Sequence, residues 1–250
     1  MPGSPLTVGA FAQGFPDQGV LPHRDYPRRV YRVVMDACRV AWARLASEVR
    51  DLGSATEDEI TAGLQRVLNA MQREVAPTVP GFTIETFERV TRGEHFANFD
   101  GARLDKQPDL RFSTIPTGTP ARLAEHHAIF AECKIVDSVG QSIHRYCKDG
   151  LQRFVDGQYS WAMPSGLMLA YARESCSVPA TLSPHLTAVC TFADPCAIKT
   201  NVVPTKDSAT GGPPWAWVST HARSWRYRRT NTAPGRIRVW HLWLSEPCDK

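Results

Sequence analysis

The stretch His127–Asp137, H-A-I-F-A-E-C-K-I-V-D, decides which fold the sequence predicts. Its apolar residues predict a buried β-strand over about 127–136, yet a glutamate and a lysine lie in the middle of it. Side chains alternate across a strand, so Glu132 and Lys134 share one face with Phe130 and Val136. Burying either charge alone would cost several kcal/mol, so each charge needs a partner from elsewhere in the chain.

A second carboxylate stands upstream, where Pro108 precedes Asp109 at the start of a strand predicted over 110–115. If the two strands pair, Asp109 lies beside Glu132. Two carboxylates at close range repel each other unless a cation lies between them, and hard oxygen ligands favour Mg²⁺ or Mn²⁺. Lys134 would then lie next to a water on that ion, where it could orient or deprotonate the water and offset phosphate charge.

Pro108-Asp109, 22 intervening positions and then Glu132-Cys133-Lys134 form the pattern P-D…E-x-K. This pattern resembles that of the PD-(D/E)XK nuclease superfamily, which includes many restriction endonucleases. The resemblance implies that Asp109, Glu132 and the Cys133 carbonyl bind a divalent metal, Mg²⁺ or alternatively Mn²⁺, and that Lys134 supports the attacking water. It also implies a restriction-endonuclease-like core with N-terminal helices.

The rest of the chain predicts an α/β fold, a mixed central β-sheet flanked by helices. We expect an irregular arm over 1–26 and a single domain over 27–250, with a Pro/Ser/Gly-rich insertion near 175–214. Helices are predicted over 27–52, after 54–56 and over 142–162, and further strands over 82–90, 166–171, 215–220 and 236–244.

Glu59, in T-E-D-E-I-T, has two readings. Family members often add a metal-binding acid from a helix before the sheet, and Glu59 neighbours Ile60, which starts the inner stripe of that helix. Alternatively, Thr56-x-x-Glu59 is a capping box in which Glu59 bonds back to the N-cap amide. We expect Glu57 and Asp58 only to complement the helix N-terminus.

Gln152 and Tyr159 are seven positions apart, two helical turns on one face. Some branches of the family place a glutamine and a tyrosine on this helix near the metal and the nucleic acid, and Gln152 resembles that glutamine. Arg153 would contact a phosphate. The alternative is that Phe154 and Tyr159 belong to the core and that Gln152 and Arg153 are solvated.

The net charge of +4 is concentrated near the C-terminus, because 221–240 contains six arginines and no acid. Ser219, His221 and Arg223 would project from one strand face, which suits phosphate contact. The other reading is a solvated edge strand whose charges prevent edge-to-edge pairing. We expect the binding role, and three following arginines would extend the surface: Arg226, Arg228 and Arg229.

Several other sequence features exclude classes of protein and kinds of site. The sequence shows neither a run of 18 apolar residues nor a secretory signal, and its seven cysteines are odd in number, which together predict a cytoplasmic protein with reduced thiols and no membrane partner. Cys176, His185, Cys190 and Cys196 lack zinc-site spacing. His241 lies among aromatic residues and is expected to be a core histidine. The sequence contains no phosphate-binding glycine loop.

The resulting prediction is a metal-dependent phosphodiesterase, an endonuclease acting on DNA in bacterial restriction or anti-phage defence. Family habit implies a homodimer or a partner protein of a defence system. The sequence leaves open two alternatives: a non-catalytic module that keeps the nuclease fold and binds nucleic acid or protein, and an RNA-directed nuclease.

Overall fold

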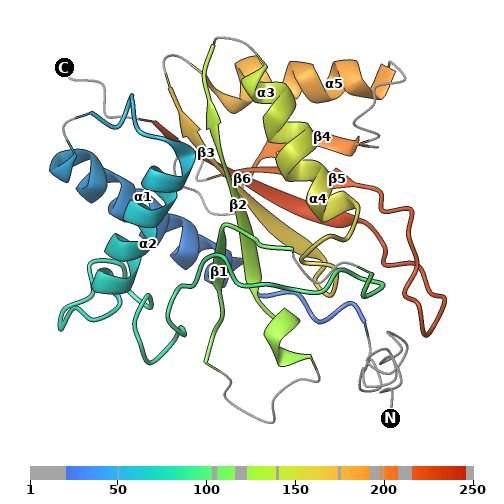
Figure 1. Ribbon diagram of the computed structural model, residues 1–250, viewed down its shortest axis with the longest axis horizontal. Coiled ribbons are helices and arrows are strands. Elements are labelled where there is room, and N and C mark those ends of the chain that lie inside the picture. Colours follow the sequence, from blue (N-terminus) through green and yellow to red (C-terminus); the bar gives the residue numbers. More distant parts are fainter. Residues whose placement is uncertain are drawn as a thin grey trace, which may run out of the picture.

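The protein folds around one six-stranded sheet with helices on both faces, as the computed structural model in Figure 1 shows. Among the described residues, no helix is long and apolar enough to span a membrane. The structure describes residues 21–49, 51–102, 106–115, 123–138, 141–173, 176–191, 198, 200–207 and 216–245.

The strand order in the sheet is β1-β2-β3-β6-β5-β4. The central pairs β2–β3 and β3–β6 are parallel, whereas β1, β5 and β4 join antiparallel. The sheet is therefore mixed. The strands are β1 Leu110–Phe112, β2 Ile129–Val136, β3 Ser165–Ala172, β4 Thr200–Lys206, β5 Trp217–His221 and β6 Ile237–Ser245.

The helices divide between the two faces of the sheet (Figure 1). The long N-terminal pair, α1 and α2, covers one face, and the shorter helices that follow β2 and β3 cover the other. The helices are α1 Arg28–Glu48, α2 Glu57–Met71, α3 Ser142–Arg145, α4 Gln152–Val155 and α5 Ser183–Thr191; η3 Tyr146–Leu151 is a π-helical segment between α3 and α4, and the short segments η2 Ala124–His126 and η4 Val178–Leu182 precede β2 and α5.

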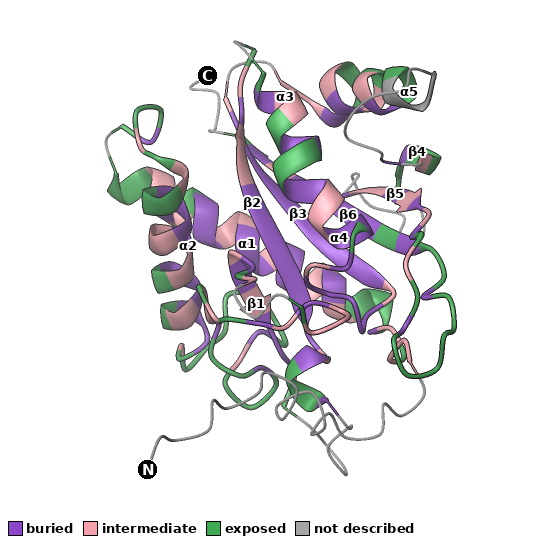
Figure 2. Cartoon of the chain, turned by 45° about the vertical axis from the view of Figure 1, so that its right-hand side comes forward, coloured by how far each residue is buried: buried purple, intermediate pink, exposed green. Residues whose placement is uncertain are grey.

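The alternation of β2 and β3 separates two apolar cores. Ala131 and Cys133 of β2 pack with α1 and α2, whereas Phe130 and Val136 pack with the opposite helical layer. The pattern in Figure 2 agrees, because β2 and β3 are almost continuously buried. Burial on both faces is typical of parallel central strands, and it places Glu132 in an apolar layer.

The structure confirms the α/β class, the mixed sheet and the pairing of the Asp109 strand with the E-x-K strand. Two element predictions are wrong. The segment 82–90 forms turns, with Phe87 only bridging to Thr114. The helix expected over 142–162 ends at Val155, because Gly157 adopts a φ of +66°, which is incompatible with a right-handed helix. The unassigned region 175–214 contributes α5 and edge strand β4, and residues 1–20 of the expected arm lie outside the described part.

Candidate active site

Two carboxylates reach the backbone of β2 beyond its pairing with β1. That pairing covers Ile129–Ala131 only. Further along, the N–H of Cys133 donates to Asp109 Oδ2 at 2.7 Å, and the N–H of Ile135 donates to Glu57 Oε2 at 3.2 Å. Buried backbone donors need partners, so these bonds fix both carboxylates at one place along β2.

The ammonium group of Lys134 lies among the acids. Its Nζ is 2.8 Å from Glu57 Oε1, 2.9 Å from Glu132 Oε1 and 3.8 Å from Asp109 Oδ2. It also donates to the Cys133 carbonyl oxygen at 2.7 Å. We call Glu57, Asp109, Glu132 and Lys134 the acid–lysine cluster. Three carboxylates, from β2, α2 and the residue before β1, thus surround one ammonium group.

Glu132 is fully buried, and donors hold both of its oxygens. Arg153 donates to Oε1 at 2.9 Å, and the Tyr159 hydroxyl donates to Oε2 in a short hydrogen bond. Gly150 allows the helical layer to approach closely here, because a Cβ at this position would lie 2.6 Å from the end of Met168 and 3.4 Å from Glu132 Cγ. The side chain is therefore fixed by packing as well as by hydrogen bonds.

Burial and the charges of neighbouring side chains shift the pKa values of the cluster residues. Burial, followed by the negative charge of Asp109, raises the pKa of Glu132 to about 7. Burial also raises the pKa of Asp109 above its ordinary value. Burial opposes the charge on Lys134, but the nearby carboxylates Glu132, Asp109 and Glu57 overcome it and raise the lysine pKa. Lys134 is therefore held as a cation and is poorly suited to remove a proton.

The donor set fits a hard divalent cation by its chemistry. The cluster supplies carboxylate oxygens and a backbone carbonyl, the ligands that Mg²⁺ and Mn²⁺ prefer. Its excess of acids over Lys134 favours further positive charge. Within the described residues, however, no three His, Cys, Asp or Glu side chains are grouped as direct metal ligands, and the carboxylates lie around the Lys134 ammonium group.

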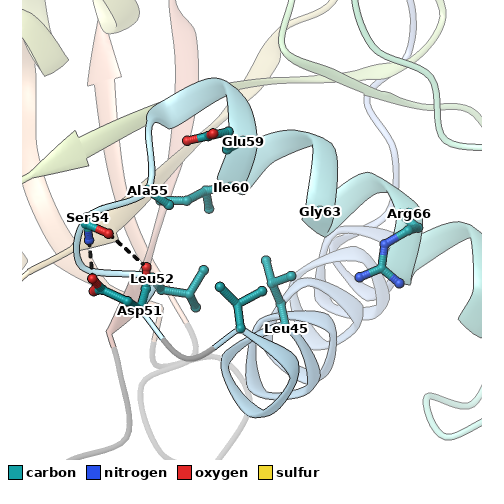
Figure 3. Close-up of a pocket in the computed structure, with 10 residues that line it drawn as sticks. Leu45, Asp51, Leu52, Ser54, Ala55, Glu59, Ile60, Gly63 and Arg66 are labelled. Carbon is teal, nitrogen blue, oxygen red and sulfur yellow. Dashed lines mark hydrogen bonds between the residues drawn. The ribbon is translucent and has the colours of Figure 1, made fainter.

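Glu59 takes the capping role and not that of a metal ligand. Its Oε2 accepts from the Thr56 N–H at 2.8 Å, and its own N–H bonds to Thr56 Oγ1 at 3.3 Å. Glu59 lines a cavity of about 480 Å³ between α1 and α2, and none of the cluster residues lines this cavity (Figure 3). The metal-ligand prediction for Glu59 is therefore wrong.

Glu57 is the helix acid that reaches the cluster, and we expected it only to complement the helix terminus. A signal for it exists in the sequence. Glu57 lies three and four positions before Ile60 and Thr61, both buried, so it continues the inner face of α2. Glu59, next to Ile60 in sequence, points about 100° away around the helix.

Of the residues predicted after β2, Arg153 and Tyr159 reach Glu132. Gln152 is partly buried at the start of α4. The side-chain hydrogen bonds to Glu132 come from Arg153 and Tyr159 instead. Tyr159 lies beyond α4, in the turn 156–160, so helical spacing with Gln152 does not explain its position. Arg153 binds a carboxylate here, although its side chain is 36% exposed.

Ser219 and His221 share one face of β5, and Arg223 lies beyond the end of that strand. All three are buried, so their assignment to nucleic-acid contact is wrong. Ser219 Oγ lies 2.6 Å from His221 Nε2 and 2.7 Å from His241 Nε2. Arg223 donates to backbone carbonyls, including those of Met163 and Pro234. His241 is a hydrogen-bonded core histidine, as expected.

The basic loop, residues 222–236, keeps part of the predicted surface. Arg226, Arg228 and Arg229 are exposed there. Arg226 donates to the Asn231 carbonyl and Arg228 to that of Asp100, contacts that leave positive charge at the surface.

Comparisons of the chain with models of protein families, with curated proteins and with solved structures gave no match. The resemblance to the PD-(D/E)XK superfamily is therefore one of sequence motif.

Proposed function

We propose that the protein is a metal-dependent nuclease that hydrolyses phosphodiester bonds of DNA. One observation supports this most strongly. Lys134 of the E-x-K motif lies among Asp109, Glu132 and a third acid, and also contacts the Cys133 carbonyl. A purely structural strand would not need to bury this many charges, since replacing buried ion pairs with apolar residues is often neutral or stabilising.

In this proposal, Asp109, Glu132 and the Cys133 carbonyl would hold Mg²⁺ or Mn²⁺, and Glu57 pairs with Lys134. The ion supplies polarisation of the scissile phosphate. Lys134, held as a cation, orients the attacking water and offsets phosphate charge. Arg153 and Tyr159 keep the Glu132 carboxylate oriented, and the exposed arginines of the basic loop bind the phosphate backbone.

The test incubates the purified protein with supercoiled plasmid, single-stranded DNA and RNA, each with Mg²⁺, Mn²⁺ or a chelator. We expect metal-dependent cleavage of DNA. Asp109→Asn should abolish it, because the amide keeps an oxygen for the Cys133 N–H but loses the charge. Glu59→Gln is the matched control and should cleave like the wild type, since Glu59 serves only as a cap.

The outcomes separate the alternative functions. Cleavage of RNA alone would identify an RNA-directed nuclease. Binding of nucleic acid without cleavage of any substrate would favour the non-catalytic module. Equal cleavage by the wild type and Asp109→Asn would reject the proposed site. Restriction or anti-phage defence is the setting we propose for a DNA-cleaving result.

A further inference from the structure

The turn 156–160, which carries Tyr159, packs directly against Trp225 of the basic loop. Gly157 has a φ of +66°, and a Cβ there would lie 2.7 Å from the Trp225 ring. The indole Nε1 donates to the Val155 carbonyl at 3.0 Å, at the last residue of α4. The indole thus contacts the chain on both sides of the point where the helix ends.

The same turn reaches the acid–lysine cluster. The N–H of Gln158 bonds to the Arg153 carbonyl at 2.9 Å, and one residue later Tyr159 donates to Glu132. Arg153 holds the second oxygen of the same carboxylate. Any shift of the turn therefore displaces a donor that orients Glu132.

Two further side chains also hold Trp225 in place. Phe99 stacks on it with ring centroids 4.5 Å apart, and the Arg223 guanidinium lies 5.2 Å from the ring centroid. The Phe99 N–H bonds to the Gly157 carbonyl at 3.2 Å, so the ring and the turn share one support. Stacking and cation–π contacts of this kind hold an aromatic side chain in one orientation.

We propose that Trp225 is a positioning residue, which keeps the Tyr159 hydroxyl on Glu132 through the Gly157 turn. The inference rests on the proposed function, in which Glu132 is a metal ligand. Groups that orient a ligand contribute to metal affinity even though they do not touch the ion. The basic loop thereby contributes to the acid–lysine cluster, although Trp225 lies more than 90 positions after Glu132 in the sequence.

The test measures Mn²⁺ binding by isothermal titration calorimetry, and folding by urea unfolding, for the wild type and three variants. Trp225→Ala should weaken Mn²⁺ binding about tenfold, the lower end of what loss of an orienting partner costs. Trp225→Phe keeps the stacked ring and should recover most of the affinity. Trp217→Ala is the matched control, because Trp217 is also partly buried but lies on β5 against Lys206. It should bind Mn²⁺ like the wild type.

If Trp225→Ala does not fold, Gly157→Ala replaces it, since the added methyl must displace the turn or the indole. Unchanged affinity in the folded variant, with DNA cleavage intact in the wild type, would overturn the positioning role and leave the nuclease proposal standing. An equal loss in Trp217→Ala would also overturn it. A wild type that neither binds Mn²⁺ nor cleaves would reject both proposals.

Discussion

Lys134 Nζ lies 2.9 Å from Glu132 Oε1, and the two side chains leave β2 on the same face. Strand alternation alone brings them together, but the pair is stable only because other elements complete it. Arg153 and Tyr159 donate hydrogen bonds to Glu132, and Glu57 accepts one from Lys134. The charges of the E-x-K motif are therefore buried as a network, and removing one member leaves others uncompensated.

Lys134→Ala should show this coupling. Without the ammonium, the three carboxylates repel one another. With a chelator present, the free energy of unfolding should therefore fall by up to about 3–5 kcal/mol, and the loss is smaller to the extent that Arg153 still neutralises Glu132. Added Mn²⁺ should then raise its melting temperature more than that of the wild type, because the carboxylates gain a replacement cation. Thermal unfolding with and without Mn²⁺ checks this, with Lys206→Ala as a surface control. A Mn²⁺ shift equal to that of the wild type would contradict the cluster as a cation site.

Glu57→Gln and Glu59→Gln form a matched pair two residues apart. Glu57→Gln removes an ion pair with Lys134, so cleavage should fall at least about tenfold. Glu59→Gln weakens only a capping hydrogen bond, so stability should fall slightly with cleavage unchanged. Plasmid cleavage and urea unfolding measure the two effects. The reverse pattern would restore Glu59 as the functional acid.

The central part of this site could be predicted from sequence, and particular residues show why. The apolar setting of Glu132 and Lys134 indicated a buried strand, and the spacing to Asp109 indicated a paired strand; both features are local. The helical period of α2 marks Glu57 as part of its inner face, whereas Glu59 is adjacent to Ile60 only in sequence.

Other features depend on which segments meet in the tertiary structure. Ser219 and His221 alternate like surface residues of an edge strand, but β4 occupies the edge and makes β5 internal. The Tyr159 contact depends on where α4 ends, which Gly157 determines. Its support by Trp225 joins segments far apart in the chain.

The exposed and the buried arginines of the basic loop should respond differently to mutation. Replacing Arg226, Arg228 and Arg229 together with Ala should weaken DNA binding at all sequences and reduce the salt slope by up to about 3, one unit for each lost phosphate contact. Arg223→Ala should instead destabilise the fold, since four backbone carbonyls each lose a hydrogen bond. Fluorescence anisotropy over a salt series and urea unfolding separate the two results. An unchanged salt slope in the triple variant would exclude this loop as the phosphate-binding surface.

The buried histidine chain predicts sensitivity to acid. Trp243 Nε1 can only donate, so Tyr146 accepts from it, and the Tyr146 hydroxyl lies 2.8 Å from His241 Nδ1. Ser219 Oγ then lies within hydrogen-bond distance of Nε2 of both His241 and His221. Burial lowers the pKa of both histidines and so favours neutral rings, and protonating either ring would turn an accepting nitrogen into a donor.

Burial lowers the pKa of His221 to about 3, whereas an unfolded histidine titrates near 6.5. The unfolded state thus binds more protons between these values, so the contribution is complete above about pH 6.5 and is lost as the pH falls toward 3. At pH 5 this one group should cost about 2 kcal/mol relative to pH 8. Glu132 acts in the opposite sense between its unfolded value and about pH 7, because its folded pKa is raised.

Comparison with His221→Gln isolates the histidine, since Glu132 contributes equally to both proteins. Urea unfolding at pH 5 and pH 8 should show a pH-dependent loss of stability that is smaller in the variant by about 2 kcal/mol, even if the variant is less stable at both values. Identical pH dependence in the two proteins would mean that His221 is not held neutral in the folded state.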